Sequence, residues 1–145
     1  TGWGIVSKEG QKITSINYGC IETLSDQLMP DRLLSLHENL LAIFNAQKPS
    51  CLAIEDLFFN TNAKTALVVG QARGVVLLAA AQYKIPVAIY TPLQVKIALT
   101  GYGRAEKSQV GQMVKIILKL KSVPKPDDTA DALAIALTHA FTVKV

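Results

Sequence analysis

The sequence is poor in the side chains that soft metals and disulfides require. Its 145 residues include only two cysteines, Cys20 and Cys51, and two histidines, His37 and His139. Neither histidine has a companion ligand at the spacing of a zinc site, and no such spacing surrounds the cysteines. The cysteines therefore predict reduced, buried thiols in a cytoplasmic protein, with a disulfide as the alternative.

The sequence also lacks an apolar run of membrane length and the loop of P-loop nucleotidases. Its most apolar stretch, near residues 77–81, is preceded by Gln71 and Arg73, whereas a membrane span needs roughly 18 apolar residues. No G-x-x-x-x-G-K-[ST] motif occurs. Because half of the residues are apolar and 18% are charged, we expect one soluble domain over residues 1–145 and no membrane partner.

Acidic residues are nearly absent from residues 96–125, where seven basic residues accompany one acid, Glu106. The basic residues are Lys96, Arg104, Lys107, Lys115, Lys119, Lys121 and Lys125. Such a segment is typical of a protein that binds a polyanion, because neutralised phosphates release their counterions. A solvated helix face is the alternative, since lysines supply one in any soluble protein.

The spacing of apolar residues predicts a single α/β domain with a mixed sheet and flanking helices. Two segments rich in β-branched residues predict an antiparallel hairpin, and two short apolar runs predict strands, of which the first should be buried on both faces. The hairpin segments are 3–7 and 12–23, and the short strands are 51–55 and 87–90. The expected helices are 28–47, 64–82, 92–99, 106–120 and 128–141.

Two glycines, Gly70 and Gly74, lie in the helix expected over residues 64–82. Each costs a helix roughly 1 kcal/mol relative to alanine, so a close approach by another helix would explain them. The apolar residues of this helix, such as Val75 and Leu78, exceed what one face of a sheet needs. A two-fold dimer contact is one explanation, and packing within the domain is the other.

Two aspartates, Asp128 and Asp131, precede the apolar segment ALAIALTHAF. As capping residues they need no further explanation, with Asp128 at the N-cap and Asp131 at N3, near the positive end of the helix dipole. Residues three apart also share one face of a helix. Because this face continues into a segment that should be buried, at least one carboxylate is expected to point inward or into a cleft, where it needs a cation or hydrogen bonds.

Glu55 adds a third carboxylate, at the carboxyl end of the strand expected over 51–55, where α/β sheets place their ligands. Asp56 should face the opposite way. A set of carboxylates suits Mg²⁺ or Mn²⁺ rather than zinc. An acidic metal site beside a basic surface is the arrangement used for phosphodiester hydrolysis, in which two ions bind the attacking water and the leaving oxygen.

Five motifs of this sequence, in order and spacing, resemble those of the RuvC-type Holliday-junction resolvases. They are AIEDLFF, GQARGV, QVK, AEKSQV and DDTADALAIALTHA, and the similarity covers essentially the whole chain. The resemblance implies a ribonuclease H-like fold and a Mg²⁺-dependent homodimer that nicks opposing strands of a four-way DNA junction in recombination and repair. It also implies a branch-migration motor complex as a partner.

The resemblance assigns catalytic roles by residue. Glu55, Asp128 and Asp131 match three of the four metal-binding carboxylates of the family, with two ions expected in the site. Lys96 in QVK and Lys107 in AEKSQV match lysines that contact DNA and support catalysis.

The resemblance also assigns DNA contacts. Phe58 matches an aromatic residue that stacks on a base near the junction centre, a contact that contributes roughly 1–3 kcal/mol. Phe59 could share that role or only pack. Asn62 and Lys64 continue as a polar loop that could contact phosphates, for which a plain surface loop is the alternative. The helix with Gly70 becomes the favoured dimer element.

The chain departs from the family pattern before Thr1. Family members begin with a strand that ends in a G-x-D-P-G-like turn, whose aspartate is the fourth metal ligand, and the strand leads into the hairpin that starts here as TGWG. That strand is central, and a sheet without it would expose two unpaired edges. We therefore expect a first central strand and a further aspartate upstream of Thr1.

Two other functions stay open on the sequence. A non-catalytic junction- or DNA-binding module of the same fold would account for a missing first aspartate. A related ribonuclease H-like nuclease would instead act on RNA or on another branched substrate. Nicking of a four-way junction tests the first alternative, and competition with an RNA hybrid tests the second.

Overall fold

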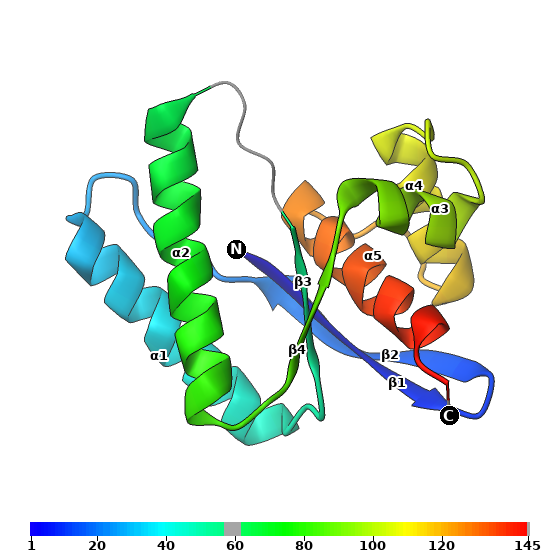
Figure 1. Cartoon of the computed structure of the whole chain (residues 1–145), viewed down its shortest axis with the longest axis horizontal. Helices are drawn as coiled ribbons and strands as arrows, with labels where there is room; N and C mark the ends of the chain where they lie inside the picture. Colours follow the sequence, from blue (N-terminus) through cyan, green and yellow to red (C-terminus); the bar gives the residue numbers. More distant parts are fainter. Residues whose placement is uncertain (57–61, 145) are drawn as a thin grey trace. The chain divides into compact units, whose positions relative to one another are not determined.

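The computed structural model describes residues 1–56 and 62–144 (Figure 1). The strands are β1 (Gly2–Glu9), β2 (Lys12–Cys20), β3 (Leu52–Glu55) and β4 (Val87–Tyr90). The helices are α1 (Met29–Gln47), α2 (Ala63–Gln82), α3 (Pro92–Thr100), α4 (Lys107–Ile117) and α5 (Asp127–Thr142). The chain divides into two compact units. Unit 1 contains Thr1–Cys20, Ala53–Asp56 and Ala88–Val145, and unit 2 contains Ile21–Leu52 and Leu57–Val87.

The described strands form two separate two-stranded sheets. β1 and β2 make the predicted antiparallel hairpin, with Ile16 as an extra residue at a register shift. β3 and β4 run parallel, because the Leu52 amide donates to the Pro86 carbonyl at 2.9 Å and the Asp56 amide donates to the Tyr90 carbonyl at 2.7 Å. Both strand directions of the predicted mixed sheet are therefore present, in two sheets rather than one.

β3 differs from its prediction in burial. All four of its residues are half-buried, although the apolar run predicts a strand buried on both faces. Within the part of the chain that the structure describes, β3 pairs with β4 alone. A strand with one neighbour keeps an edge open, so its side chains retain part of their solvent exposure.

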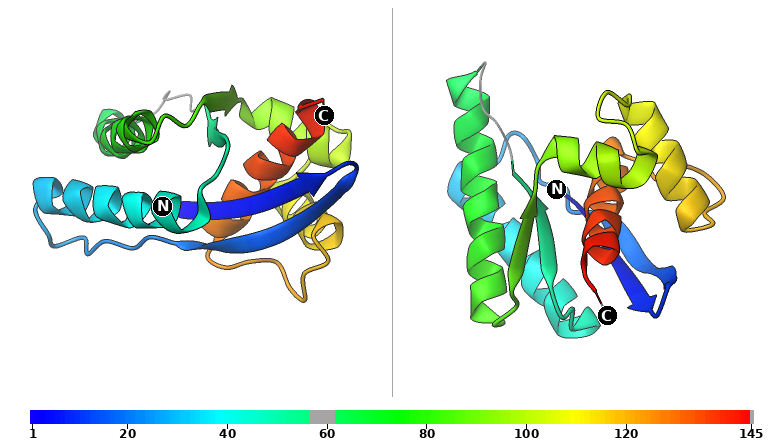
Figure 2. Two further views of the ribbon diagram at one scale, coloured as in Figure 1. Left: turned by 90° about the horizontal axis from the view of Figure 1, so that it is seen from below. Right: turned by 45° about the vertical axis from the view of Figure 1, so that its right-hand side comes forward.

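Helix α5 carries the hydrophobic core of unit 1. Leu133 and Leu137 are fully buried, as is Val114 of α4. α5 packs against β1 and also against α3 and α4 (Figure 1), and the views in Figure 2 show the same helix running along the hairpin. The prediction that the segment ALAIALTHAF is buried is thus confirmed as far as Ala140, whereas Phe141 is 44% exposed.

Side-chain hydrogen bonds determine where α3 begins, and a left-handed residue accompanies the end of α4. At the start of α3 the Gln94 amide donates to Thr91 Oγ1 at 3.1 Å, and the Thr91 amide donates to Gln94 Oε1 at 2.7 Å, which is a capping box. α4 ends at Ile117 rather than at the predicted residue 120. Lys119 adopts a left-handed φ of 55°, and this turn is a common way to end a helix.

Unit 2 is built from α1 and α2. The ring of Phe44 meets that of Tyr83 edge-on, with 5.8 Å between centroids, and His37 Nε2 lies 2.7 Å from Gln82 Oε1. α2 is mostly apolar but contains Lys64, Gln71 and Arg73. By length and hydropathy it resembles a membrane-spanning helix, which is weak evidence because core helices of soluble proteins meet the same criteria.

Candidate active site

The start of α5 places three carboxylates within two helical turns. The helix begins one residue earlier than predicted, with Pro126 at the N-cap and no side-chain capping bond. The Thr129 amide donates to the Pro126 carbonyl at 2.9 Å. The prediction of Asp128 as N-cap and Asp131 at N3 is therefore wrong, because these residues occupy the second and fifth helical positions. Capping does not account for either carboxylate.

The hairpin of unit 1 holds this helix start in place. Thr129 is only 1% exposed, and its hydroxyl donates to the Gly19 carbonyl of β2 at 3.2 Å. A Cβ on Gly2 would overlap the backbone of Asp128. Gly2, the first glycine of TGWG, therefore lets β1 approach α5 closely. The backbone that carries the aspartates is positioned by β1 and β2.

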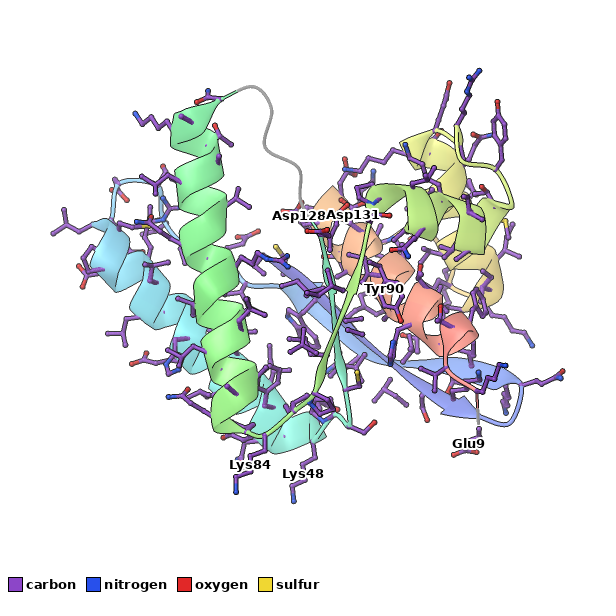
Figure 3. All side chains as sticks on the ribbon, in the orientation of Figure 1. Glu9, Lys48, Lys84, Tyr90, Asp128 and Asp131 are labelled. Atoms are coloured by element: carbon purple, nitrogen blue, oxygen red, sulfur yellow. The ribbon has the colours of Figure 1, made fainter. Side chains whose placement is uncertain are left out.

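Lys107, the first residue of α4, brings a positive charge to these carboxylates. Its Nζ lies 3.1 Å from Asp131 Oδ2 and 3.9 Å from Asp127 Oδ2. The hydrogen bond to Asp131 raises the pKa of Lys107 above its usual value, and the charges of Asp131, Asp127 and Asp128 add to this effect. Lys107 is therefore held as an ammonium ion beside the start of α5. Figure 3 shows Asp128 and Asp131 next to each other at this helix start.

Glu55, the last residue of β3, is electrostatically coupled to the same group. Burial raises the pKa of this half-buried carboxyl, repulsion by Asp131 raises it further, and attraction by Lys107 opposes both. The carboxyl end of β3, the start of α4 and the start of α5 thus meet at one place in unit 1. The sequence predicts a cluster of Glu55, Asp128 and Asp131; in the structure Glu55 interacts electrostatically with Asp131 and Lys107.

The chemistry of this group fits a hard divalent cation. The oxygens that it could offer to a metal are carboxylate oxygens, which Mg²⁺ and related ions prefer. Burial raises the pKa of Glu55, and the repulsion by Asp131 that raises it further is one that a cation would relieve. In the described part of the chain, however, no three His, Cys, Asp or Glu side chains are gathered closely enough to hold a metal ion. The ammonium group of Lys107 is the positive charge that bridges the aspartates here.

Asp127 is a site residue that the sequence analysis misses. Lys107 approaches one of its oxygens, and Lys125 Nζ lies 3.4 Å from the other. The signal was present in the doublet Asp127–Asp128. Because the helix starts at Asp127, this carboxylate shares its first turn with Asp128.

Other predicted residues lie apart from the carboxylates or outside the described residues. Lys96 lies in the middle of α3, and no ion pair joins it to a described carboxylate. Asn62, in unit 2, caps α2, since its Oδ1 accepts from the Lys64 amide at 3.0 Å and from the Thr65 amide at 3.4 Å. The Lys64 side chain is exposed. Phe58 and Phe59 belong to residues 57–61, which are not described.

The two cysteines agree with the prediction of reduced thiols. Cys20 ends β2 and Cys51 precedes β3, and neither forms a disulfide. Both are partly buried rather than fully enclosed.

Comparison with known proteins identifies the family. A family model described as "Crossover junction endodeoxyribonuclease RuvC" matches residues 1–139. The proteins with this description from Desulfitobacterium hafniense and Alkaliphilus metalliredigens are 53% identical over 144 residues and 54% identical over 141 residues. These alignments cover 99% and 97% of this chain, and 87% and 86% of the relatives.

A solved structure also matches nearly the whole chain. T. thermophilus RuvC in complex with a Holliday junction substrate superimposes with a TM-score of 0.91 at 40% identity, covering 97% of this chain and 86% of that one. This match confirms the predicted ribonuclease H-like fold. Since the family model spans nearly the whole chain and the relatives are identical to it at more than half of the aligned residues, the chain belongs to the RuvC family of crossover junction endodeoxyribonucleases.

Proposed function

We propose that Glu55, Asp128 and Asp131, together with Lys107, form the catalytic centre with which this chain cuts four-way DNA junctions. Membership of the RuvC family makes the chain a Holliday-junction resolvase that acts in recombination and repair with a divalent metal. The observation that carries the assignment of the site is the position of the Lys107 ammonium, 3.1 Å from Asp131 and close enough to Glu55 to oppose the rise in its pKa.

Mg²⁺ is the metal that we propose, with two ions per site. Glu55, Asp128 and Asp131 would hold it, and a fourth carboxylate upstream of Thr1 is part of the same proposal. When bound, the ions would acidify a water and stabilise the leaving 3′ oxygen. Repulsion between Glu55 and Asp131 supports this assignment, because it leaves the carboxylates in need of positive charge.

Lys107 has a separate role in this proposal. Its pKa is raised, so it stays protonated at neutral pH, and its side chain is 63% exposed, within reach of a phosphate. We expect it to offset the negative charge that develops on the phosphate during cleavage. Lys96, on neighbouring α3, would contact the DNA backbone.

A homodimer formed through α2 follows from the properties of that helix. A Cβ on Gly70 or Gly74 would meet no described atom within 4 Å, while Leu67 and Leu78 are 63% and 54% exposed. A two-fold contact between α2 helices would bury these leucines, and the glycines would permit a close approach of the two backbones. Two equivalent sites would then serve two equivalent strands.

The remaining DNA contacts and the cellular context belong to the same proposal. Phe58, with Phe59 beside it, would stack on a base at the junction centre. Asn62 and Lys64 would contact phosphates. The enzyme would work in the cytoplasm, beside a branch-migration motor.

The variant Asp131→Asn tests the catalytic site. In the full-length protein we expect it to bind a synthetic four-way junction within twofold of wild type and to cleave it more than about 100-fold more slowly in Mg²⁺. Asp26→Asn, an exposed change in unit 2, is the control and should cleave normally. Cleavage by Asp131→Asn near the wild-type rate would show that the metal assignment is wrong.

The same assay separates the alternative functions. A wild-type protein that binds the junction but does not nick it in Mg²⁺ or Mn²⁺ would be a binding module rather than an enzyme. Competition between the junction, a linear duplex and an RNA–DNA hybrid tests the substrate. Preference for the hybrid would contradict the assignment to DNA junctions.

A further inference from the structure

The connection between α3 and α4 exposes an aromatic ring beside an arginine. Residues 101–106 read GYGRAE, and side chains project outward from this connection in unit 1 (Figure 3). Tyr102 is 56% exposed, more than Tyr18, Tyr83 or Tyr90. Arg104 is exposed too, and no ion pair joins it to any residue that the structure describes. An exposed ring with a nearby arginine is the combination that proteins use to hold unstacked bases and their phosphates.

Several contacts hold this turn in one conformation. Gly101 has a left-handed φ of 76°, and the Tyr102 amide donates to Thr100 Oγ1 at 3.1 Å. The Ala105 amide donates to the Tyr102 carbonyl at 3.1 Å, and Ala105 itself is 3% exposed. A Cβ on Gly103 would come within 2.7 Å of a side chain on α3. The backbone is therefore anchored on both sides of Tyr102 and Arg104. A ligand that binds these side chains would not incur the entropy cost of ordering the turn.

The charge around the turn favours a polyanion over a protein partner. Residues 92–107 contain three cations, Lys96, Arg104 and Lys107, and one acid, Glu106, which leaves a net charge of +2. Leu93 and Ile97 of α3 are also exposed, at 55% and 51%. An apolar surface with surplus positive charge suits the faces of bases joined by phosphates.

The turn lies a short distance along the chain from the proposed catalytic centre. Arg104 precedes Lys107 by three residues, which an extended backbone spans in at most about 11 Å. One strand of duplex DNA advances roughly 3.4 Å per nucleotide, so this reach corresponds to about three nucleotides.

We propose that Tyr102 and Arg104 form a second DNA contact, which holds the strand next to the cleaved phosphate. Arg104 neutralises a phosphate within about three nucleotides of the cut. Tyr102 stacks on a base that is unstacked in the opened junction. The position relative to the cut depends on the proposed function, whereas the DNA contact itself does not.

The contact made by Tyr102 is tested by binding without Mg²⁺, so that no cleavage occurs. Tyr102→Ala in the full-length protein should bind a four-way junction at least about fivefold more weakly, because one stacked base is lost, and should bind a linear duplex within twofold of wild type. Tyr102→Phe should bind like wild type. Tyr18→Ala, a change of a 40% exposed tyrosine on β2, is the matched control and should bind the junction normally.

A fluorescent base gives a direct readout of stacking. With 2-aminopurine placed at each of the three nucleotides beside the cut, wild type should change the fluorescence at one of them, and Tyr102→Ala should not. Junction binding by Tyr102→Ala within twofold of wild type, or an unchanged fluorescence response in that variant, would overturn the role of Tyr102. The exposed apolar surface would then fit a protein partner better.

Arg104 is tested by the salt dependence of binding. Arg104→Ala should reduce the slope of log affinity against log salt by about 1 for both junction and duplex, and Arg104→Lys should restore it. Lys12→Ala, at an exposed position of β2, should leave the slope unchanged. An unchanged slope in Arg104→Ala would overturn its contact with a phosphate. These experiments measure binding alone, whereas Asp131→Asn tests cleavage. A wrong assignment of Tyr102 and Arg104 is therefore distinguishable from a wrong assignment of the catalytic site.

Discussion

Helices α2 and α5 both begin with polar residues, but they use them differently. At the start of α2, the side chain of Asn62 accepts hydrogen bonds from two backbone amides. At the start of α5, no side chain caps the helix, and the carboxylates of Asp127 and Asp131 instead face Lys107. A side-chain oxygen that caps a helix has its lone pairs committed to the backbone. The carboxylates of α5 are therefore available to bind a cation, as they do with Lys107.

The difference depends on what holds each helix start. α2 relies on local hydrogen bonds, whereas α5 is held by the hairpin, through the bond from Thr129 to Gly19 and the close contact of Gly2 with the Asp128 backbone. Because neighbouring strands stabilise the start of α5, its acidic residues are not required for that purpose.

The largest expected effect is on cleavage, in Lys107→Ala. Loss of a positive charge beside the reacting phosphate should lower the cleavage rate about 10²–10³-fold. The free energy of unfolding should change by less than about 1 kcal/mol, because the pair with Asp131 is exposed. Single-turnover cleavage and urea unfolding measure the two quantities.

Lys125→Ala is the control for Lys107→Ala, since Lys125 also approaches Asp127 but is 77% exposed and contacts no other carboxylate of the described site. It should cleave within a few-fold of wild type. Equal losses in both variants would mean that general charge, rather than the position of Lys107, matters at the start of α5.

The second effect concerns stability, in Gly2→Ala. The new methyl group would meet the backbone of Asp128, which cannot move aside without shifting α5, so unfolding should become easier by about 1–3 kcal/mol. Gly19→Ala, on β2, is the control, because its methyl group would lie 3.2 Å from the side chain of Trp3 and requires only a small shift there. Urea denaturation should rank Gly2→Ala as clearly the less stable. The reverse order would mean that the hairpin does not hold the start of α5.

A smaller effect compares the two helix starts directly. Asn62→Ala should lower the free energy of unfolding by about 1 kcal/mol, because two amide hydrogens lose their acceptor. Asp128→Ala should change it by no more than about 0.5 kcal/mol, since this exposed residue makes no capping bond. Asn62→Asp, which keeps a capping oxygen, should remain near wild type. If Asp128→Ala cost as much as Asn62→Ala, the carboxylate would be a cap after all.

The same contrast explains how much could be predicted from the sequence. Periodicity placed each helix and strand to within a few residues, because local spacing of apolar residues is what it reads. Periodicity did not predict the start of α5 or the end of α4 correctly. Pro126 serves as the cap only because the hairpin supports the helix, and the left-handed turn at Lys119 leaves no clear pattern.

The candidate site divides in the same way. The carboxylates Glu55, Asp128 and Asp131 could be chosen from their positions at element ends, whereas the contact of Lys107 with Asp131 joins residues far apart in the chain and is visible only in the fold. Asp127 was missed because a capping model of Asp128 puts it outside the helix. The fully buried Leu133, by contrast, follows from the apolar segment alone.

The smallest expected effect is on the pH dependence of stability and concerns His139, near the carboxyl end of α5. Its burial opposes the effect of the helix dipole. A charged histidine would favour the carboxyl end of a helix, but burial lowers the pKa of His139 below its usual 6.5. The Tyr90 hydroxyl lies 2.7 Å from its Nδ1 and can donate to the neutral ring. The unfolded chain therefore binds a proton more readily than the folded one. This contribution to stability is complete above pH 6.5 and is lost as the pH falls toward the lower pKa of the folded state.

Urea unfolding of wild type and His139→Gln between about pH 5 and pH 7 measures this contribution, because the other titrating groups are common to both proteins. The wild type should gain stability relative to the variant as the pH rises through this range. Tyr90→Phe should retain part of the dependence, since it removes the hydroxyl while leaving the histidine buried. Parallel curves for wild type and His139→Gln would mean that the pKa of His139 does not change on folding. A wild type that loses stability relative to the variant as the pH rises would mean that the helix end, rather than burial, dominates.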